Sequence, residues 1–481
     1  MSKYDQYQAV IGLEVHIQLL TKSKAYSFEA AEYGADPNTL VSPITLGHPG
    51  TLPYFNKQAM EFGIKLGIAT NCTINEYNGF ARKNYFYADL PKGYQITQDK
   101  TPICTQGSII IETKEGDKVI GITRIHLEED AGKSMHDKDP MDSLVDFNRC
   151  GVPLLEMVSE PDLRSAEDAY AYLTEVRKLV RYLDICDGNM EEGSLRCDAN
   201  ISVMKKGALE FGTKVEVKNM NSIRNVQRAI EFEIKRQIDL LEAGESFTSE
   251  TRSFDATAGT TFSLRSKEAA NDYRYFPEPD LPPFRVKADA IEKIKANMPA
   301  LPRELFAKFT KELGLSDYDA RNLTDSKETA RYFSEVIAQN VAAKAAANWI
   351  LGPVKGYLNE EALDWNGLNL SPKKLAELIA LVDSGKISFT AASMQVFPEL
   401  LKDPEKSPES IAIEKDIIQE SNDDFLESIA KEVLEAWPDK VAEYQSGKKG
   451  VLGLFMGDLM KKSKGKADPK KASAILQKLL G

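Results

Sequence analysis

Acidic, basic and imidazole side chains occur at every second position in three separate segments of the sequence. In the first, residues 11–19, apolar side chains alternate with Glu14, His16 and Gln18. A period of two predicts a half-buried β-strand and puts these three side chains on one face. Glu14 and His16 then lie roughly 6–7 Å apart, and a hard cation can be held between them. A solvated polar face is the alternative, and this segment alone favours it.

The same alternation recurs in residues 122–133 and 193–203. The polar face of the first comprises Arg124, His126, Glu128 and Asp130, and that of the second Ser194, Arg196, Asp198, Asn200 and Ser202. After a turn around residues 205–207 the alternation resumes over residues 211–218, including Glu216, which predicts a β-hairpin. Carboxylates interleaved with lysine and arginine on one sheet face suit a magnesium–nucleotide complex better than a structural role.

Cationic and aromatic side chains are interleaved in residues 80–98. The cations are Arg82, Lys83 and Lys92, and the aromatic residues include Tyr85, Phe86, Tyr87 and Tyr94. Cations can neutralise phosphate while aromatic faces stack on a base, so this segment is a candidate nucleotide-binding element. A buried aromatic cluster with surface lysines is the alternative.

Several common active-site motifs are incomplete or missing. Residues 131–134 (Ala-Gly-Lys-Ser) resemble the end of a phosphate-binding P-loop, but Leu127 stands where the required glycine would be. No G-x-G-x-x-G follows a predicted strand, and there is no G-x-S-x-G elbow. The five cysteines are widely scattered, which gives no support to a disulfide framework or a CxxC zinc site. A P-loop NTPase and a Rossmann enzyme are therefore excluded, and a nucleophilic hydrolase is unsupported.

The length of 481 residues corresponds to about three domains. Up to about residue 286 the pattern is α+β, with helices expected at 166–183, after the N-cap Ser165, and at 222–243. Residues 303–401 read as helical, with Ser371 as an N-cap before Pro372, and a small helical tail follows. Proline-containing stretches separate these parts, and the predicted domains are residues 1–294, 295–406 and 407–481.

The charge is unevenly distributed. The net charge of −12 argues against a general nucleic-acid coat, yet residues 448–478 contain nine lysines against two aspartates. A basic end on an acidic protein is a local footprint for a polyanion, and a solvated helix surface is the alternative. The candidate nucleic-acid contacts are Lys448, Lys449, Lys461, Lys462, Lys464 and Lys466.

Nothing in the sequence directs the chain to a membrane. No apolar run approaches the ~20 residues of a membrane span, and the N-terminus leads straight into the first predicted strand. Together with the scattered cysteines, this predicts a cytoplasmic protein without membrane contact.

Six ordered blocks of sequence together resemble one family. They are Ile-Gly-Leu-Glu-Val-His (11–16), Arg-Lys-Asn-Tyr-Phe-Tyr (82–87), Leu-Pro-Lys-Gly-Tyr-Gln-Ile (90–96), His-Leu-Glu-Glu-Asp-Ala-Gly-Lys (126–133), Gly-Ser-Leu-Arg-Cys-Asp-Ala-Asn (193–200) and Asp-Tyr-Arg-Tyr-Phe-Pro-Glu-Pro-Asp-Leu (272–281). Over essentially its whole length the chain is similar to the B subunits of the aspartyl/glutamyl-tRNA(Asn/Gln) amidotransferases. The resemblance implies an α+β fold: an antiparallel-sheet cradle domain similar to glutamine synthetase, an all-α domain, and a small helical tail similar to the YqeY proteins.

The resemblance also implies an activity, that of a glutamine-dependent ligase forming C–N bonds. Such proteins use ATP and Mg²⁺ to phosphorylate the side-chain carboxylate of misacylated Glu-tRNA(Gln) or Asp-tRNA(Asn). Ammonia, which the amidase (the A subunit) releases from glutamine, then displaces the phosphate, giving Gln-tRNA(Gln) or Asn-tRNA(Asn). The expected assembly is a heterotrimer with this amidase and a small third protein, the C subunit.

Carried over by motif, the resemblance assigns roles to individual residues. The implied metal ligands are Glu14, His16, Glu128, Glu129, Asp198 and Glu216. Lys83 and Arg196 would neutralise the transferring phosphate and act with Glu128 as catalytic residues. The implied nucleotide contacts are Lys83, Tyr85, Lys92, Tyr94 and Glu216. The basic tail would lie along the tRNA, where phosphate contacts position the RNA without reading bases.

Two departures from the family pattern are visible. Many relatives carry cysteine pairs for zinc after the first strand, whereas residues 21–71 contain no cysteine, so no zinc is predicted. Ala88 stands where the family usually has proline, which affects a local turn rather than the chemistry.

Two other functions stay open on the residues alone. A tRNA-docking scaffold with a vestigial sheet site would keep the basic tail and lose the carboxylates, which are all present. A free-standing ATP-dependent amide ligase for a small metabolite would need neither the helical domain nor the tail. Truncation of the chain near Leu401 distinguishes this ligase from a tRNA-dependent enzyme. The ligase would keep its activity, whereas a tRNA-dependent enzyme would lose turnover through weakened RNA binding.

Overall fold

The computed structural model describes residues 3–135, 139, 141–266, 273–419, 423–463 and 467–481. The chain divides into two compact units, Met1–Pro302 and Arg303–Gly481. The first contains the sheets and four of the α-helices, and the second is helical throughout its described part. The predicted change from an α+β part to a helical part is confirmed, while the three-domain division stays a prediction.

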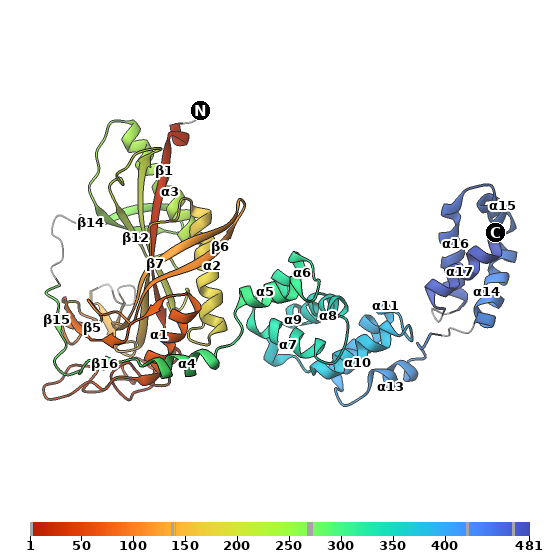
Figure 1. Cartoon of the computed structure of the whole chain (residues 1–481), viewed down its shortest axis with the longest axis horizontal. Coiled ribbons are helices and arrows are strands. Elements are labelled where there is room, and N and C mark those ends of the chain that lie inside the picture. The colour runs from red at the N-terminus through yellow and green to blue at the C-terminus, as the bar shows by residue number, and fades with distance from the viewer. Residues whose placement is uncertain (1–2, 136–138, 140, 267–272, 420–422, 464–466) are drawn as a thin grey trace. The chain divides into compact units, whose positions relative to one another are not determined.

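Among the described residues, nine strands form the main sheet of the first unit, in the spatial order β14-β13-β12-β11-β1-β10-β7-β6-β2. Figure 1 labels β14, β12, β1, β7 and β6 of this sheet. Their bounds are β1 Tyr7–Gln18, β2 Thr73–Ile74, β6 Cys104–Thr113, β7 Gly116–Glu129, β10 Pro153–Ser159, β11 Leu195–Lys205, β12 Val215–Lys218, β13 Glu250–Asp255 and β14 Thr260–Ser266. All neighbouring pairs are antiparallel except β12 and β13, which run parallel. The sheet is therefore mixed rather than wholly antiparallel, and the likeness to glutamine synthetase stays a prediction.

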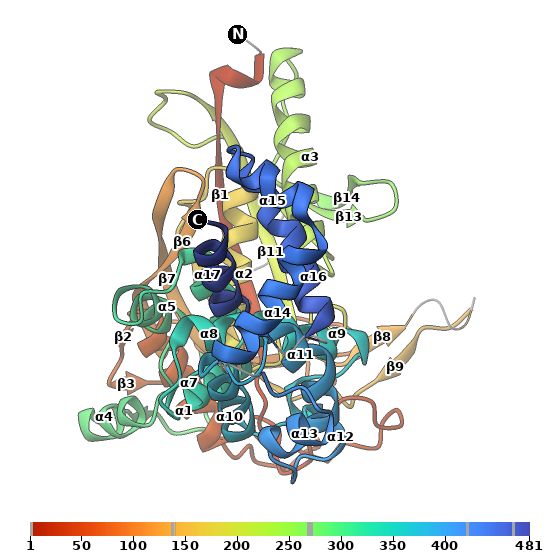
Figure 2. The same ribbon diagram turned by 90° about the vertical axis from the view of Figure 1, so that its right-hand side faces the viewer.

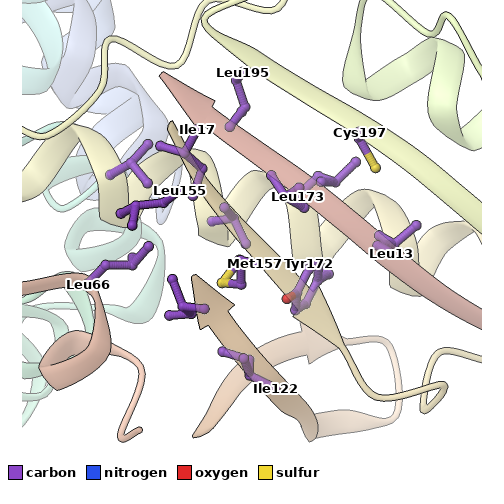
Figure 3. Close-up of a cluster of buried hydrophobic side chains, with 14 of the residues drawn as sticks. Leu13, Ile17, Leu66, Ile122, Leu155, Met157, Tyr172, Leu173, Leu195 and Cys197 are labelled. Carbon is purple, nitrogen blue, oxygen red and sulfur yellow. The ribbon is translucent and has the colours of Figure 1, made fainter. Parts of the chain in front are cut away.

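The hydrophobic core lies on one face of this sheet, under helices α1 (Lys57–Ala69), α2 (Ala166–Tyr182) and α3 (Ile223–Glu242). Figure 3 shows Leu13 and Ile17 of β1 on the side of the strands that faces Tyr172 and Leu173 of α2. All four side chains are at most 1% exposed. Because side chains alternate along a strand, burial of these residues leaves Glu14 and its polar neighbours on the opposite, open face.

Both helices predicted in this unit form where their N-caps place them. The Ser165 hydroxyl accepts a hydrogen bond from the backbone N–H of Asp168 (3.0 Å), and Ser222 accepts one from Asn225 (3.1 Å). Such caps satisfy backbone donors that the first helical turn leaves unpaired.

The predicted hairpin differs from expectation in its second strand. Regular pairing with β11 begins only at Val215, and residues 206–214 form a loop instead of the first part of a strand. This loop approaches β11 so closely that a Cβ atom on Gly212 would lie 2.1 Å from the carbonyl oxygen of Val203. The backbone of this loop therefore lies against β11 without forming a regular strand ladder with it.

The described residues of the first unit also form three small sheets. Their strands are β3 Tyr77–Asn78, β4 Ala81–Asn84, β5 Tyr94–Thr97, β8 Lys133–Met135, β9 Leu144–Asp146, β15 Phe276–Pro277 and β16 Phe284–Arg285. β15, β4 and β5 form one sheet, β16 pairs with β3, and β8 and β9 form a hairpin that projects from the unit (Figure 2). The unit also contains a short 3₁₀ turn at Lys3–Gln6 and helix α4 (Ala288–Ala296).

The described part of the second unit contains two separate hydrophobic cores, one built from residues between Phe309 and Ala412 and one from residues between Leu426 and Leu480. Its α-helices are α5 Pro302–Lys311, α6 Asp317–Leu323, α7 Lys327–Ile337, α8 Ala343–Trp349, α9 Lys355–Glu360, α10 Pro372–Asp383, α11 Phe389–Ala391, α12 Phe397–Lys402, α13 Pro408–Glu414, α14 Asp423–Ala436, α15 Pro438–Gln445, α16 Leu452–Lys462 and α17 Pro469–Leu480. Ser371 caps α10 as predicted, accepting a hydrogen bond from the Lys374 N–H (3.3 Å). Among the described residues, none of the helices combines the length and apolar character needed to cross a membrane.

Replacing Leu13 by alanine should lower the free energy of unfolding of the first unit by about 2–5 kcal/mol, because it removes buried methyl groups and leaves a cavity. Hydrogen exchange of β1 peptides in increasing urea measures this loss. All three tryptophans lie in the second unit, so tryptophan fluorescence follows the unfolding of that unit, which serves as the control. The urea midpoint of the tryptophan fluorescence should be the same in the variant and in wild type. Hydrogen exchange in β1 that is the same in the variant and in wild type would contradict the assignment of Leu13 to the core.

Candidate active site

Adjacent strands bring polar side chains of the open face into rows. In the central row Arg196 of β11 is paired with His16 of β1, His16 with Glu156 of β10, and Glu156 with His126 of β7. Directly opposed residues on antiparallel strands have Cβ atoms about 4.5–5.5 Å apart. The row therefore brings together one carboxylate, two imidazoles and one guanidinium group from strands that are distant in sequence.

The first carboxylate cluster consists of His16, Glu128 and Glu156. Nε2 of His16 lies 3.3 Å from Oε2 of Glu156 and 3.6 Å from Oε1 of Glu128. Nε2 of His126 lies 3.5 Å from Oε2 of the same Glu156 and 3.6 Å from Oε2 of Glu128. One potential ligand atom from each cluster residue lies within 4.8 Å of the other two.

Ion pairing sets the charge state of this cluster. Burial lowers the pKa of His16, but the hydrogen bond to Glu156 and the charge of Glu128 outweigh burial and raise that pKa to about 9. Burial raises the pKa of Glu156, but His126, His16 and Lys83 outweigh burial and hold the pKa below its usual range. Without a metal ion, His16 is therefore an imidazolium between two carboxylates at neutral pH.

The second carboxylate cluster consists of Glu14, Asp198 and Glu216, which also place ligand atoms within 4.8 Å of one another. Lys218 forms ion pairs with Asp198 and with Oε1 of Glu216, the latter at 3.1 Å. Burial lowers the pKa of Lys218, but these two carboxylates outweigh burial and raise it above its usual range. Asn200 donates a hydrogen bond to Oε1 of Glu14 (2.8 Å) and fixes the orientation of that carboxylate.

Both donor sets fit a hard divalent cation. The second cluster offers carboxylate oxygens alone and the first adds one imidazole, and oxygen ligands of this kind suit magnesium. Each cluster already has a cationic side chain, His16 within the first and Lys218 paired with the second, whose charge a bound metal ion would replace or supplement. Carboxylates so close together are stable only when such a charge is present.

Lys83 of β4 lies beside the first cluster. Burial lowers its pKa, but Glu128 and other acidic groups outweigh burial and raise it, so the ammonium group is charged. Nζ lies 5.0 Å from the ring centre of Tyr273 and 5.9 Å from that of Tyr85. A charged lysine held among aromatic rings next to carboxylates is placed to neutralise a phosphoryl group.

Arg196 is fixed at the end of the central row by Asp130. One guanidinium nitrogen lies 2.9 Å from Oδ2 of Asp130, which also accepts a hydrogen bond from Gln18 (2.8 Å). Burial raises the pKa of Asp130, but Arg196 and Arg149 outweigh burial and lower it. The sequence-predicted Arg196 thus stands next to His16 with its charge oriented by a buried carboxylate.

Comparison with known proteins now identifies the family. A family model described as the GatB/GatE catalytic domain matches residues 9–292, and one described as the GatB domain matches residues 331–480. The chain belongs to the family of aspartyl/glutamyl-tRNA(Asn/Gln) amidotransferase B subunits.

Relatives with that name match along the whole chain. The protein of Thermodesulfovibrio yellowstonii is 50% identical over 475 residues, which cover 99% of both chains. That of a Synechococcus strain is 49% identical and covers 99% of this chain and 98% of its own. That of Geobacter sulfurreducens is 49% identical and covers 98% of this chain and 99% of its own. The resemblance inferred from the six sequence blocks is confirmed.

Five of the six metal ligands implied by the family fall into the two carboxylate clusters, and Glu129 does not. Glu129 follows Glu128 on β7 and therefore points to the other face of the strand. There it pairs with Lys92 and accepts a hydrogen bond from the Ile96 N–H (3.0 Å). The structure thus gives Glu128 and Glu129 different surroundings.

Of the implied nucleotide contacts, some lie at the carboxylate clusters and others lie away from them. Tyr85 lies beside Lys83, and Glu216 belongs to the second cluster. Lys92 is engaged with Glu129, and the guanidinium of Arg82 lies 4.1 Å from the ring centre of Tyr94. The structure does not bring Lys92 and Tyr94 to either carboxylate cluster.

Glu156 belongs to the site but was not assigned to it from the sequence, whereas His126 and Lys218 lie on strand faces predicted to be polar and were given no individual role. The signal that marks Glu156 is its place as the single charged residue of the mostly apolar strand β10. His126 shares the alternating face of Glu128, and Lys218 shares that of Glu216, so strand period alone associates both with the site.

Three of the described lysines predicted to contact nucleic acid have local partners. Lys448 pairs with Glu443 (3.2 Å), Lys462 with Glu432 (3.7 Å), and Nζ of Lys449 lies 4.0 Å from the ring centre of Tyr444. Lys461 is exposed. Lys464 and Lys466, also predicted to contact nucleic acid, lie outside the described residues.

Replacing Glu14 by glutamine should reduce the thermal stabilisation that millimolar Mg²⁺ gives the protein, because the second cluster loses one of three carboxylates. In the metal-free protein the melting temperature should stay within about 2 °C of wild type, since Glu14 is oriented by neutral Asn200 and its removal relieves like-charge repulsion. Melting curves with and without Mg²⁺ measure both effects.

The matched control for that experiment is Glu115→Gln, an exposed carboxylate in the turn between β6 and β7. It should leave the magnesium response unchanged. An equal magnesium response in wild type and Glu14→Gln would show that the second cluster does not bind the ion.

Proposed function

We propose that this chain activates the side-chain carboxylate of Glu-tRNA(Gln), Asp-tRNA(Asn) or both with ATP, as the B subunit of a glutamine-dependent tRNA amidotransferase. The observation that carries the proposal is the pair of carboxylate clusters on one open sheet face, flanked by Lys83 and Arg196. Family membership supports tRNA as the substrate carrier, because the curated relatives are named for aspartyl- and glutamyl-tRNA.

The chemistry proposed for this face is phosphoryl transfer. When bound, magnesium ions supply charge neutralisation for the phosphates of ATP. Lys83 and Arg196 supply positive charge that balances the transferring phosphoryl group, and Asp130 keeps Arg196 in place. Because little covalent chemistry is asked of the protein, positioning and charge are the main catalytic contributions.

The products follow from a balanced two-step sequence. One oxygen of the substrate carboxylate attacks the γ-phosphorus of ATP, ADP leaves, and an acyl phosphate forms on the tRNA-bound amino acid. The nitrogen lone pair of ammonia then attacks the acyl carbon, and inorganic phosphate leaves with the C–O bond electrons while ammonia loses a proton. The amide of Gln-tRNA(Gln) or Asn-tRNA(Asn) results.

The cysteines support a mechanism without a covalent enzyme intermediate. Burial raises the pKa of the thiols of Cys72, Cys104, Cys150, Cys186 and Cys197. A thiol with a raised pKa is a poor nucleophile at neutral pH. Activation of the substrate by ATP removes the need for a nucleophilic side chain.

The proposed assembly contains two further proteins. An amidase, the A subunit, would release ammonia from glutamine, and the small C subunit would complete a cytoplasmic heterotrimer. ATP and Mg²⁺ are the proposed cofactors, and the absence of zinc stays a prediction.

Replacing Glu128 by glutamine should lower tRNA-dependent ATP turnover by roughly 10²-fold or more, because the first cluster loses a charged ligand. The assay uses the reconstituted heterotrimer with Glu-tRNA(Gln) or Asp-tRNA(Asn) and follows ADP release. Glu115→Gln serves as the control and should keep full turnover. If the wild-type heterotrimer binds charged tRNA but never turns over ATP, the chain is a docking scaffold and the proposal is wrong.

Replacing both Lys461 and Lys462 by glutamate should weaken tRNA binding and reduce its salt dependence, because each lost phosphate contact lowers the slope of log K against log salt by about one. Turnover at saturating charged tRNA should stay near wild type. Filter binding at several salt concentrations measures the slope. Glu435→Gln, at an exposed position of α14, is the control, and an unchanged slope in the lysine variant would place the RNA elsewhere.

A further inference from the structure

The strand that carries Glu216 is the shortest of those that contribute to the two carboxylate clusters. β12 has four residues, lies between the loop 206–214 and Asn219, and is joined to β11 over three residue pairs. Asn219 has a φ of 63°, which ends the strand, and its side chain donates a hydrogen bond to Ser253 of β13 (3.0 Å). The strands of the other two carboxylates, β1 and β11, are 12 and 11 residues long. The position of Glu216 therefore depends on its neighbour β13.

A buried hydroxyl of β13 holds the Glu216 carboxylate. The two strands run parallel, and Glu216 is paired with Thr251. The Thr251 hydroxyl donates a hydrogen bond to Oε2 of Glu216 (2.9 Å), and Thr251 is 2% exposed. Oε1 of Glu216 lies 3.1 Å from Nζ of Lys218, which also pairs with Asp198. By holding one oxygen, Thr251 turns the other toward the second cluster.

β13 is anchored from the opposite face of the sheet. Arg252 donates hydrogen bonds to Glu250 (2.6 Å) and to the Thr261 hydroxyl (2.8 Å). Its Nε lies 3.6 Å from Oε2 of Glu233 on α3, a carboxylate with no exposed surface. Consecutive residues of a strand point to opposite faces, so these contacts fix β13 without occupying the open face. Thr251 therefore presents its hydroxyl from an anchored strand.

The two partners of Glu216 differ in how they tolerate a metal ion. Lys218 is positively charged and is repelled by a divalent cation that lies between the same carboxylates. The Thr251 hydroxyl is neutral and makes its hydrogen bond to Glu216 whether or not a cation is present. Of these two contacts, the one from Thr251 is therefore compatible with a metal-bound cluster.

We propose that Thr251 is a positioning residue of the second carboxylate cluster, and that its hydroxyl keeps Glu216 oriented toward the cluster when magnesium binds there. This inference rests on the proposed function, which takes the cluster as a metal site. Hydrogen-bond partners of metal ligands orient those ligands, and loss of such a partner lowers metal affinity by roughly 10- to 100-fold. Thr251 acts through Glu216 and has no contact with substrate in this proposal.

Replacing Thr251 by valine removes the hydroxyl at nearly constant side-chain volume. Mn²⁺ is a paramagnetic substitute for magnesium at carboxylate sites, and the EPR signal of free Mn²⁺ measures its binding to the intact heterotrimer without ATP or tRNA. Thr251→Val should raise the dissociation constant of one ion by roughly tenfold or more. Thr251→Ser keeps a hydroxyl and should bind Mn²⁺ nearly as wild type does. Equal weakening in the serine and valine variants would show that the hydroxyl is not the cause and overturn the inference.

Thr261→Val is the matched control for a loss of stability. Thr261 is also a buried threonine of the β13–β14 pair, but its hydroxyl donates to Glu233 on the helix side of the sheet (3.0 Å). The variant should have a lower melting temperature and unchanged Mn²⁺ binding. If Thr261→Val weakens Mn²⁺ binding as much as Thr251→Val, the effect is a general loosening of these strands and the inference is wrong.

A double substitution connects the effect of Thr251 to the cluster itself. In Glu14→Gln the second cluster has already lost one carboxylate, so adding Thr251→Val should weaken Mn²⁺ binding by much less than it does in wild type. Two changes that act on one bound ion are expected to be non-additive. Fully additive losses would place the effect of Thr251 outside the cluster and overturn the inference.

The outcomes also separate the inference from the function on which it rests. Unchanged Mn²⁺ affinity in Thr251→Val, while Glu14→Gln binds Mn²⁺ more weakly than wild type, would overturn the inference and leave the proposed metal site intact. Identical Mn²⁺ binding in wild type and Glu14→Gln would show that the second cluster holds no metal ion, which overturns that part of the proposed function together with the inference.

Discussion

Negative charge gathered on one sheet face must be balanced within the site, and this constraint governs the arrangement of the whole open face. Glu128 and Glu156 are balanced by two imidazoles and by Lys83, while Asp198 and Glu216 are balanced by Lys218. Isolated carboxylates removed from water would raise their pKa and become neutral. Each of these carboxylates has a lysine or an imidazole beside it, and these neighbours keep the carboxylates of the open face apart from unpaired like charges.

The alternation of side chains separates stability from chemistry along single strands. On β1 the odd-numbered residues from Ile11 to Ile17 are fully or almost fully buried against the helices, while Glu14 and His16 face the site. The buried face contributes the stabilisation, so the open face can carry repelling charges and a glycine that weakens the strand. Substitution of a buried residue of β1 therefore acts on stability, whereas substitution of its neighbour on the open face acts on the site.

Strand period is a local property, and the sequence was sufficient to predict it. It put Glu14 with His16, and Arg196 with Asp198, on common faces, and the N-caps of α2 and α10 were equally readable. Register between strands is not local: the pairing of Glu14 with Asp198 joins residues far apart in the chain, and only the assembled sheet defines it.

The departures from expectation have different causes. The family resemblance grouped Glu129 with Glu128, although consecutive residues of a strand cannot share a face. The role of Glu156 depends on register, because its partners, His16 and His126, lie on other strands. The loop 206–214 departs from the strand pattern because Gly212 permits a backbone approach to Val203 that no side-chain period reveals.

The order of groups along β1 gives the proposed site a direction. Moving by twos along β1, the open face presents the second cluster at Glu14, the first cluster at His16, and then Gln18, which donates a hydrogen bond to the carboxylate that orients Arg196. On the proposed function, a triphosphate lying along this strand would keep its leaving ADP at one end and its terminal phosphate near the cations at the other. Phosphoryl transfer needs this separation, because the acceptor must approach the terminal phosphorus from the side away from the leaving ADP. The proposed function therefore gives the two carboxylate clusters, on successive rows of the sheet, separate positions along the triphosphate.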